Sequence, residues 1–443
     1  MPAADRHHPV VRVTRSGVLP AVAAVSLGLA WSLGPVPPAV ADLDAPDCYD
    51  VDDEMESEAI TGSNPVLEFL RVDRAHHVLS AVGEGVAVVL LDTGVSPDFE
   101  AADVTHVPPL GTARTPEIES PHGTVAAGIV VGPDRKDPVT RERIRIGIAP
   151  AAQLYSVPIY DVPSNTTATT SDVSEPDPAA VTAGLQWVID NRTLPDRTVV
   201  LVPTAVGKDP ALKTALDTLE EQGRLVVAPA GDRPASEEEA NTALLDYVHA
   251  EGRPPGEDAA GRLWPVAGRS VLGVGVSGDV DVTEHVVLSS DVDIAAPING
   301  AASYALNDAA CEVNAYSSDL AAAVVAGVAA MVWSMHSGDT AAELRSRLLR
   351  TADGNPLTTS KVSGYGIVQP VEALERSIEP RGNGRPAAPR DHDRVGERAD
   401  PPPDREDVLA DTRRNAVWWG LVGGATLVVA LVLRPVLARR RAR

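Results

Sequence analysis

The stretch GVAVVLLDTGV, from Gly85 to Val95, begins with a continuous apolar run and ends in a polar turn. An apolar residue at every position, without the alternation of a half-buried strand, is typical of a strand buried on both faces of a parallel sheet. Asp92 follows directly, at the carboxyl end of the expected strand, where open α/β sheets bind ligands and react. Because Asp-Thr-Gly is also a common turn, its role depends on the rest of the chain.

Similar apolar runs recur along the chain, and helical patterns fall between them. The runs are Thr198 to Val202, Leu225 to Ala228 and Val271 to Val276, and the helical patterns are Ala180 to Ile189 and Ala211 to Glu221. Strands that alternate with helices indicate a parallel sheet covered on both faces. Two polar stretches, Asp161 to Pro178 and Arg233 to Arg262, are expected as surface insertions.

A second stretch of interest is AYSSDLAAAVVAGVAAM, from Ala315 to Met331. Its small apolar residues from Leu320 onward predict a tightly packed helix. The preceding polar corner, Ser317 to Asp319, is the kind of position at which several hydrolase folds carry a nucleophile. The structural alternative is that Asp319 serves as the helix N-cap, where its charge also suits the helix dipole.

A histidine opens another small, apolar stretch. His122, Gly123 and Thr124 precede the run from Val125 to Val130. A histidine at a helix start, with glycine beside it, can be presented to a cleft. Taken alone, the motif is weak and more typical of a surface histidine.

Composition limits the classes of partner. The 443-residue chain carries a formal net charge of −24. Binding to nucleic-acid phosphates needs clustered Lys and Arg, so this charge argues against a nucleic-acid partner. The sequence shows neither internal repeats nor metal-finger spacing, and we expect no cofactor and no bound metal.

The first 41 residues have the pattern of an export signal. Basic residues precede an apolar run from Val18 to Leu33, and Ala39 to Ala41 supply small residues for cleavage. The run is short for a bilayer of about 30 Å, although an uncleaved anchor helix is the alternative. Residues 42–64 form an acidic N-terminal extension, in which Asp42 to Glu58 is expected to be extended and solvated.

The C-terminal end has the pattern of a membrane anchor. After a globular region (65–378) and a Pro-, Arg- and Asp-rich stalk (379–414), residues 415–434 are expected to form a membrane-spanning helix. Its stretch from Ala416 to Leu433 is apolar and uncharged, with two tryptophans at the leading edge. An arginine-rich tail, residues 435–443, follows. The positive-inside rule therefore predicts a single-pass protein of the cell membrane, with its main domain outside and its C-terminus in the cytoplasm.

The chain has two cysteines, Cys48 in the acidic extension and Cys311 just before the second stretch. Outside the cytoplasm we expect them to pair, which would close a long loop and tie the extension to the domain. Two free, buried thiols are the alternative.

Taken together and in order, the motifs resemble the subtilisin-like serine proteases, or subtilases, from about Arg71 to Leu374. The matching segments are GVAVVLLDTGV, HGTVAAGIVVG, GIAPAAQLYSVPI and GYGIVQPVEAL. The resemblance implies a subtilisin-like three-layer fold. With the export signal, stalk and anchor, the chain is most similar to mycosins, the membrane-anchored subtilases of actinobacterial type VII secretion systems. This likeness implies type VII membrane components as partners. The short extension resembles that of mycosins and not a folded inhibitory propeptide.

Only part of the family's catalytic machinery carries over to this sequence. The catalytic Asp falls on Asp92 and the catalytic His on His122, and both match. The oxyanion Asn falls on Asp232, within APAGD, and does not match. Aligning the family's Val-Ala-Gly on residues 325–327 puts its nucleophilic serine on Asp319.

These substitutions predict a loss of hydrolysis. Asp319 has no hydroxyl for His122 to activate, and a histidine between Asp92 and Asp319 would favour its protonated form, which is not a base. An ionised Asp232 would offer only acceptors to a developing oxyanion. We therefore expect a catalytically inactive subtilase homologue with a structural role in type VII secretion.

Several alternatives remain open from the sequence. Ser318 could act as the nucleophile in a shifted register, or the Asp319 carboxylate could itself attack. The four groups Asp92, His122, Asp232 and Asp319 could together bind a divalent cation. Two other functions also remain open. The chain could be an active endopeptidase with an atypical nucleophile, or a peptide-binding pseudoenzyme that captures a peptide or protein chain without cutting it.

Overall fold

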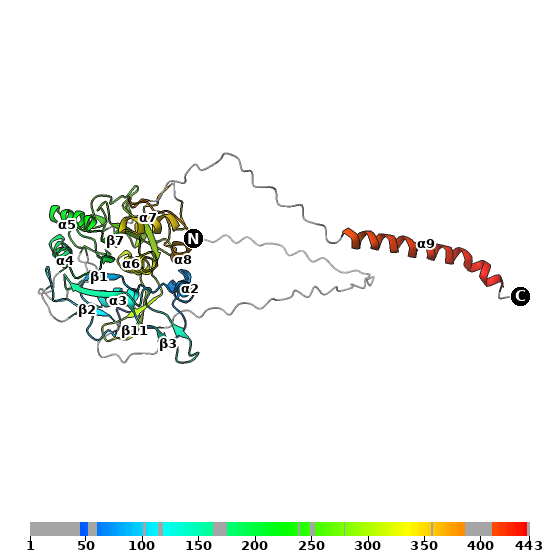
Figure 1. Ribbon diagram of the computed structural model, residues 1–443, viewed down its shortest axis with the longest axis horizontal. Coiled ribbons are helices and arrows are strands. Elements are labelled where there is room, and N and C mark those ends of the chain that lie inside the picture. Colours follow the sequence, from blue (N-terminus) through cyan, green and yellow to red (C-terminus); the bar gives the residue numbers. More distant parts are fainter. Residues whose placement is uncertain are drawn as a thin grey trace, which may run out of the picture.

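The main body of the protein is a three-layer α/β domain in which a sheet lies between two sets of helices (Figure 1). The computed structural model describes residues 45–51, 60–100, 103–113, 118–162, 175–237, 240–248, 253–278, 280–355, 358–385 and 410–440. The mostly parallel α/β architecture expected from the sequence is confirmed. The expected export signal, residues 1–41, lies outside the described residues.

Seven parallel strands form the main sheet, in the order β2-β5-β1-β6-β7-β8-β9. Their bounds are β1 Ala87–Asp92, β2 Val104–His106, β5 Gln153–Pro158, β6 Thr198–Leu201, β7 Leu225–Pro229, β8 Leu272–Ser277 and β9 Ile294–Pro297. The chain adds β5 on one side of β1 and β6 on the other. The carboxyl end of β1 therefore lies where the connections diverge, which is the usual site of chemistry in open parallel sheets.

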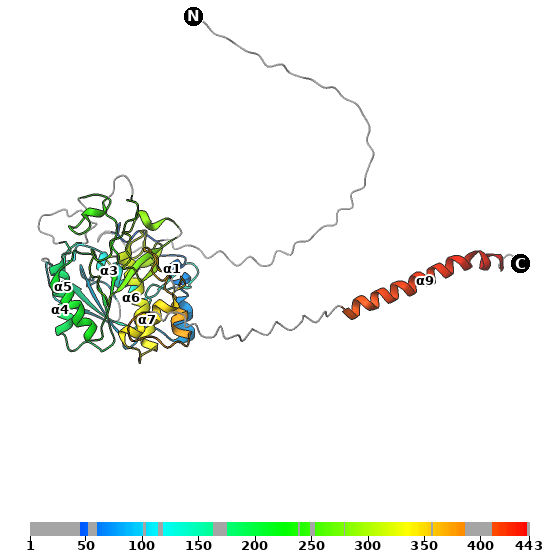
Figure 2. The same cartoon turned by 90° about the horizontal axis from the view of Figure 1, so that it is seen from above.

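Alternate residues of β1 enter two separate cores, as the period of two in a strand requires. Val88 and Leu90 pack with α3 (His122–Val131) and α6 (Ser318–Met335) on one face. Val89 and Leu91 pack with α4 (Pro178–Asp190) and α5 (Pro210–Glu221) on the other. Figure 2 shows α4 and α5 on one side of the sheet and α6 on the opposite side.

Helix α6 crosses the interior of the domain, and every residue from Ser318 to Trp333 is buried. It packs against α3 and against the strands β1, β6, β7, β8 and β9. Such close approach needs small side chains. At Gly327, for example, an added Cβ would lie 2.9 Å from the Cβ of Ile148. The Ala-rich sequence of α6 thus follows from its position in the core.

Smaller elements complete the domain. They are α1 (Pro65–Phe69), α2 (Val72–Leu79), α7 (Ala341–Thr351), α8 (Pro370–Glu375), the antiparallel pairs β3 (Arg135–Lys136) with β4 (Arg143–Ile144) and β10 (Ala301–Tyr304) with β11 (Ala310–Val313), and two 3-10 turns, Leu245–Tyr247 and Val282–Glu284. The hairpin β10–β11 packs on α3 and leads directly into α6.

The expectation that residues 233–262 form only a surface insertion is wrong. Leu244, Tyr247 and Ala259 from this stretch are buried in a third, small core, which also contains residues from outside the stretch. Arg233 and Glu257 form a buried ion pair at 2.6 Å, with side chains 7% and 2% exposed. Of the other expected insertion, residues 163–174 lie outside the described residues.

The two ends of the expected globular region also differ from the sequence-based boundaries. Within the acidic extension, Cys48 is buried and bonded to Cys311, so this part of the extension is not a solvated arm. At the other end, the expected start of the stalk still contacts the domain. The backbone of Arg381 and Arg385 is hydrogen-bonded to the hydroxyl of Ser346 in α7.

A long helix, α9 (Ala410–Arg440), contains the expected anchor segment. Its window from Thr412 to Arg434 has a mean hydropathy of 2.1 and no buried residue, so it is long and apolar enough to cross a membrane. Helix α6 has similar length and composition, but 89% of it is buried in the domain, so it is a core helix.

The packing of α3 against the turn after β1 gives a direct test of the fold. A Cβ added at Gly123 would lie 2.2 Å from the backbone oxygen of Gly94. Because backbone cannot swing away as a flexible side chain does, we expect Gly123→Ala to lower the free energy of unfolding by roughly 1–3 kcal/mol. Chemical denaturation measures this loss. Gly338→Ala is the control, since nothing lies within 4 Å of its added Cβ, and equal stability of the two variants would contradict the packing described.

Candidate active site

Asp92 and His122 form a buried pair at the carboxyl end of β1. The Nδ1 atom of His122 lies 2.9 and 2.8 Å from the two carboxylate oxygens of Asp92. Asp92 is fully buried and His122 is 2% exposed. The first turn of α3 delivers the histidine, and the close contact of Gly123 with Gly94 brings that turn onto the end of β1.

Two further donors hold the Asp92 carboxylate in place. The hydroxyl of Tyr160 donates to its Oδ1 at 2.9 Å, and the backbone N–H of Thr93 donates to the same atom at 2.7 Å. Tyr160 follows β5, whose last residue, Pro158, is the register partner of Asp92. Tyr160 was not predicted from the sequence. Its position just beyond the strand that pairs with β1 was the available signal.

The polar corner before α6 differs from the expected arrangement in one respect. Ser317, and not Asp319, is the N-cap, because its Oγ accepts a hydrogen bond from the N–H of Leu320 at 3.2 Å. Asp319 is the second residue of the helix. Its carboxylate therefore has no capping role.

Asp232 is bonded to the residue before Asp319. Its Oδ1 accepts from the backbone N–H of Ser318 at 2.5 Å and from the Ser318 hydroxyl at 2.6 Å. The same hydroxyl oxygen accepts from the N–H of Gly231 at 3.1 Å. Asp232 thus links the segment after β7 to the start of α6.

The neighbouring Arg233 reinforces this link, and the sequence analysis did not single it out. Its guanidinium donates to Glu257 and to the backbone carbonyls of Tyr247 and Val286. A charge-assisted network of this kind is well ordered when its partners are buried. This network holds Arg233 in place, and with it the backbone of the adjacent Asp232.

Asp319 is a buried carboxyl group without a compensating partner. The residue is 8% exposed, and its Oδ1 is buried with no hydrogen-bond partner. Burial, followed by the charges of Asp232 and Asp92, raises the pKa of Asp319 well above its usual value. The physical cause is that an isolated carboxylate is expensive in a medium of low polarity.

The pKa values of His122 and Asp232 are each set by opposing effects. Burial lowers the pKa of His122, but the attraction and hydrogen bond of Asp92, together with the charge of Asp232, raise it overall. Burial raises the pKa of Asp232 against the hydrogen bonds from Ser317 and Ser318. The second carboxylate that acts on the histidine is therefore Asp232, where the sequence analysis expected Asp319.

The alternative of a cation site is not supported. Among the residues that the structure describes, no three His, Cys, Asp or Glu side chains are grouped as metal ligands. The Nδ1 atom of His122 is engaged by Asp92, and the Oδ1 atom of Asp232 is engaged by Ser318.

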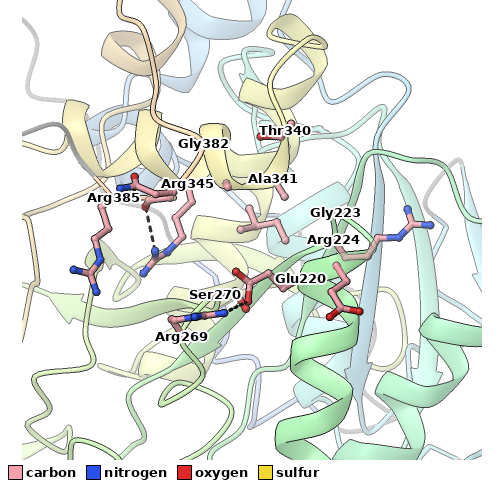
Figure 3. A pocket seen from close by; sticks show the side chains of 15 residues that line it. Glu220, Gly223, Arg224, Arg269, Ser270, Thr340, Ala341, Arg345, Gly382 and Arg385 are labelled. Atoms are coloured by element: carbon pink, nitrogen blue, oxygen red, sulfur yellow. Dashed lines mark hydrogen bonds and ion pairs between the residues drawn. The ribbon is translucent and has the colours of Figure 1, made fainter.

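Two cavities differ in their relation to this site. One of about 210 Å³ lies beside it and is lined by Thr93, His106, Ile118, Pro158 and Asp161, among others. A larger one, of about 620 Å³, lies at the amino-terminal ends of β7 and β8, between Arg224, Arg269, Arg345 and Arg385 (Figure 3). Arg269 and Arg345 are already paired, with Glu220 and Asp293. The larger cavity is therefore remote from the carboxyl ends of the strands and from Asp92.

A model of the subtilase family matches residues 83–366, which contain Asp92, His122, Asp232 and Asp319. The chain belongs to the subtilase family. It is 27% identical to Mycosin-3 of Mycobacterium tuberculosis over 81% of this chain and 80% of that protein. It is 26% identical to Subtilisin NAT of Bacillus subtilis subsp. natto over 66% of this chain and 67% of that protein.

Solved structures show the same fold at lower identity. The crystal structure of MycP1 from the ESX-1 type VII secretion system matches with a TM-score of 0.56 and 20% identity, over 79% of this chain and 94% of that one. A chain of an intact ESX-5 inner membrane complex matches with a TM-score of 0.56 and 18% identity, over 88% and 94%.

The Asp92–His122 pair has the geometry of a base and its orienting acid. Asp92 holds His122 through Nδ1, which is the arrangement that lets the other ring nitrogen act on a nucleophile. At the start of α6, however, the hydroxyl of Ser318 points to Asp232 and Gly231, and that of Ser317 accepts from the helix.

The raised pKa of Asp319 predicts a pH-dependent stability. Above about pH 4 an unfolded aspartate has released its proton, while the native Asp319 retains it. Because the native state then binds more protons, its stability falls by up to about 1.4 kcal/mol per pH unit until the native pKa is reached. Asp319→Asn removes this contribution.

We therefore expect the gain in melting temperature caused by Asp319→Asn to be larger at pH 8 than at pH 4. Thermal denaturation at both pH values measures it. Asp190→Asn changes an exposed residue of α4 and is the control. A gain that is the same at both pH values would show that the Asp319 carboxyl is not buried as described.

Proposed function

We propose that the chain is a catalytically inactive subtilase homologue. The observation that carries this proposal is the absence of a hydroxyl at residue 319, the second residue of the buried helix α6, while the two preceding serines are held by other partners. His122 retains its partner Asp92, but Asp319 has no hydroxyl that it could deprotonate. Without a hydroxyl at this position, the base cannot generate the nucleophile of a serine protease.

The size of the effect supports inactivity. In subtilisin, which belongs to the same family, removal of the nucleophilic serine lowers the rate about 10⁶-fold. Loss of the oxyanion asparagine costs about 10²–10³-fold. The chain carries both changes, and a carboxyl group at residue 232 accepts hydrogen bonds from Ser318 where a donor would be needed.

We further propose a structural role in a type VII secretion complex. The chain is similar to Mycosin-3 over most of its length, and the structural matches include a chain of an ESX-5 inner membrane complex and MycP1 of ESX-1. A role in assembly would use the surface and the anchor of the protein. Neither needs a nucleophile, which fits the altered site.

The apolar helix α9 would anchor this assembly component to the cell membrane. Its window is uncharged over most of its length, and arginines follow it in the sequence. This charge distribution favours a cytoplasmic C-terminus and an extracytoplasmic subtilase domain.

Restoring the two missing groups tests the proposed inactivity. We expect the wild-type chain to remain unlabelled by a fluorophosphonate probe. The double variant Asp319→Ser with Asp232→Asn should be labelled at position 319 after prolonged incubation, and should hydrolyse a generic peptide several orders of magnitude faster than wild type. The matched control is Asp319→Ala with Asp232→Asn, which restores no hydroxyl. Wild-type labelling at Ser317 or Ser318 would overturn the proposal.

A fractionation experiment tests the anchor. The full chain should stay in the membrane fraction after an alkaline carbonate wash, and a chain that ends at residue 409 should be released. A chain that lacks only residues 435–443 is the control and should remain bound. Retention of the chain ending at residue 409 would point to an uncleaved N-terminal segment as the anchor instead.

A further inference from the structure

One arginine holds helix α2 against the hairpin β3–β4. Arg145, the residue after β4, donates from its guanidinium to Nδ1 of His76 at 3.1 Å and to Nε2 of His77. Its Nε donates to the carboxylate of Asp73, in the first turn of the same helix. Only 11% of the Arg145 side chain is exposed. We call this arginine and its three partners on α2 the latch.

The hydrogen bonds of the latch need both histidines to be neutral. A guanidinium has N–H donors and no acceptor, so each histidine nitrogen that faces it must carry a lone pair. In His76 the proton therefore lies on Nε2, which donates to the carbonyl of Ile148 at 2.8 Å. Both ring nitrogens of His76 are thus in use. A second proton would have to replace the hydrogen bond from Arg145.

Charged groups of both signs surround His76, which is 8% exposed. From the hairpin it faces Arg145 and Asp134, whose carboxylate lies 3.6 Å from the Arg145 guanidinium. Asp73 is the acidic group on its own helix. The other charged groups around α2 are Glu68 of α1, Arg143 of β4, which pairs with Asp134, and the ion pairs Arg71–Glu372 and Arg74–Glu375 with α8.

The two ends of α2 make it an element that can detach locally. Arg71 before the helix and Ser80 after it have φ values of 55° and 56°, in the left-handed region. Neither residue is glycine, so each junction carries backbone strain that the packing of α2 must offset. With eight residues, the helix is also too short to be stable on its own. Its attachment therefore depends on contacts such as the latch.

We propose that the latch is a pH-sensitive switch, which releases α2 from the hairpin when His76 and His77 take up protons. A proton on the facing nitrogen of either ring places an N–H and a positive charge against the guanidinium. The hydrogen bond from Arg145 is then lost, and the two cations repel each other in a place that little water reaches. Helix α2 is thus attached at neutral pH and loosened in an acidic medium.

The attached state binds fewer protons than the released state. Burial lowers the pKa of His76, and the charge of Arg145 lowers it further. The hydrogen bond to Ile148 and the charges of Asp134 and Asp73 offset only part of this shift. A released histidine takes up its proton near pH 6.5. The attachment is therefore fully stable above about pH 6.5 and loses stability as the pH falls below that value.

Hydrogen exchange at pH 8 and at pH 5, corrected for the intrinsic rate at each pH, measures the release. Mass spectrometry of the full-length protein reads the protection of residues 72–80 from exchange. We expect this protection to be lower at pH 5 by about tenfold or more, because proton uptake at pH 5 favours the released state. Helix α5 has no histidine and is the internal reference, which should lose no protection.

Glutamine at both positions removes the titration but keeps a donor and an acceptor. In the variant His76→Gln with His77→Gln, the protection of α2 at pH 5 should therefore stay close to its value at pH 8. His106→Gln changes an exposed histidine of β2 outside the latch. It is the matched control and should show the full loss.

If the double variant folds poorly, His77→Gln alone changes only an exposed residue and should reduce the loss of protection. Equal protection of α2 at both pH values in the wild type would overturn the proposal. A loss in the glutamine variants as large as in the wild type would overturn it as well.

Discussion

The burial of α6 is the constraint on which the rest of the structure depends. A helix enclosed from Ser318 to Trp333 must carry small side chains, and its position between α3 and the sheet leaves little freedom to shift. Its first turn is therefore delivered to one place, at the carboxyl ends of β1 and β7. Asp92 from β1, Asp232 after β7 and Asp319 from α6 are brought together because the sheet and this helix are packed, and not because carboxyl groups attract one another.

That convergence has an electrostatic consequence. Three carboxyl groups with a single histidine cannot all ionise in a buried site, since like charges oppose each other's ionisation. Asp92 is stabilised by His122, Tyr160 and the Thr93 N–H, and Asp232 by Ser318. Asp319 receives no comparable partner, and its raised pKa reflects this. The raised pKa favours the neutral form of Asp319, and a neutral carboxyl group costs less to bury than an ionised one.

The elements with a strong local signal could be predicted from the sequence. The runs that became β1, β6, β7 and β8 are continuous and apolar, because strands buried on both faces have no polar side. In contrast, β5 includes Gln153 and Ser156, and no uniform run marked it. The identities of Asp92 and His122 could be predicted from motif order. The capping role of Ser317 and the contact between Ser318 and Asp232 could not, because both depend on where neighbouring side chains point in three dimensions.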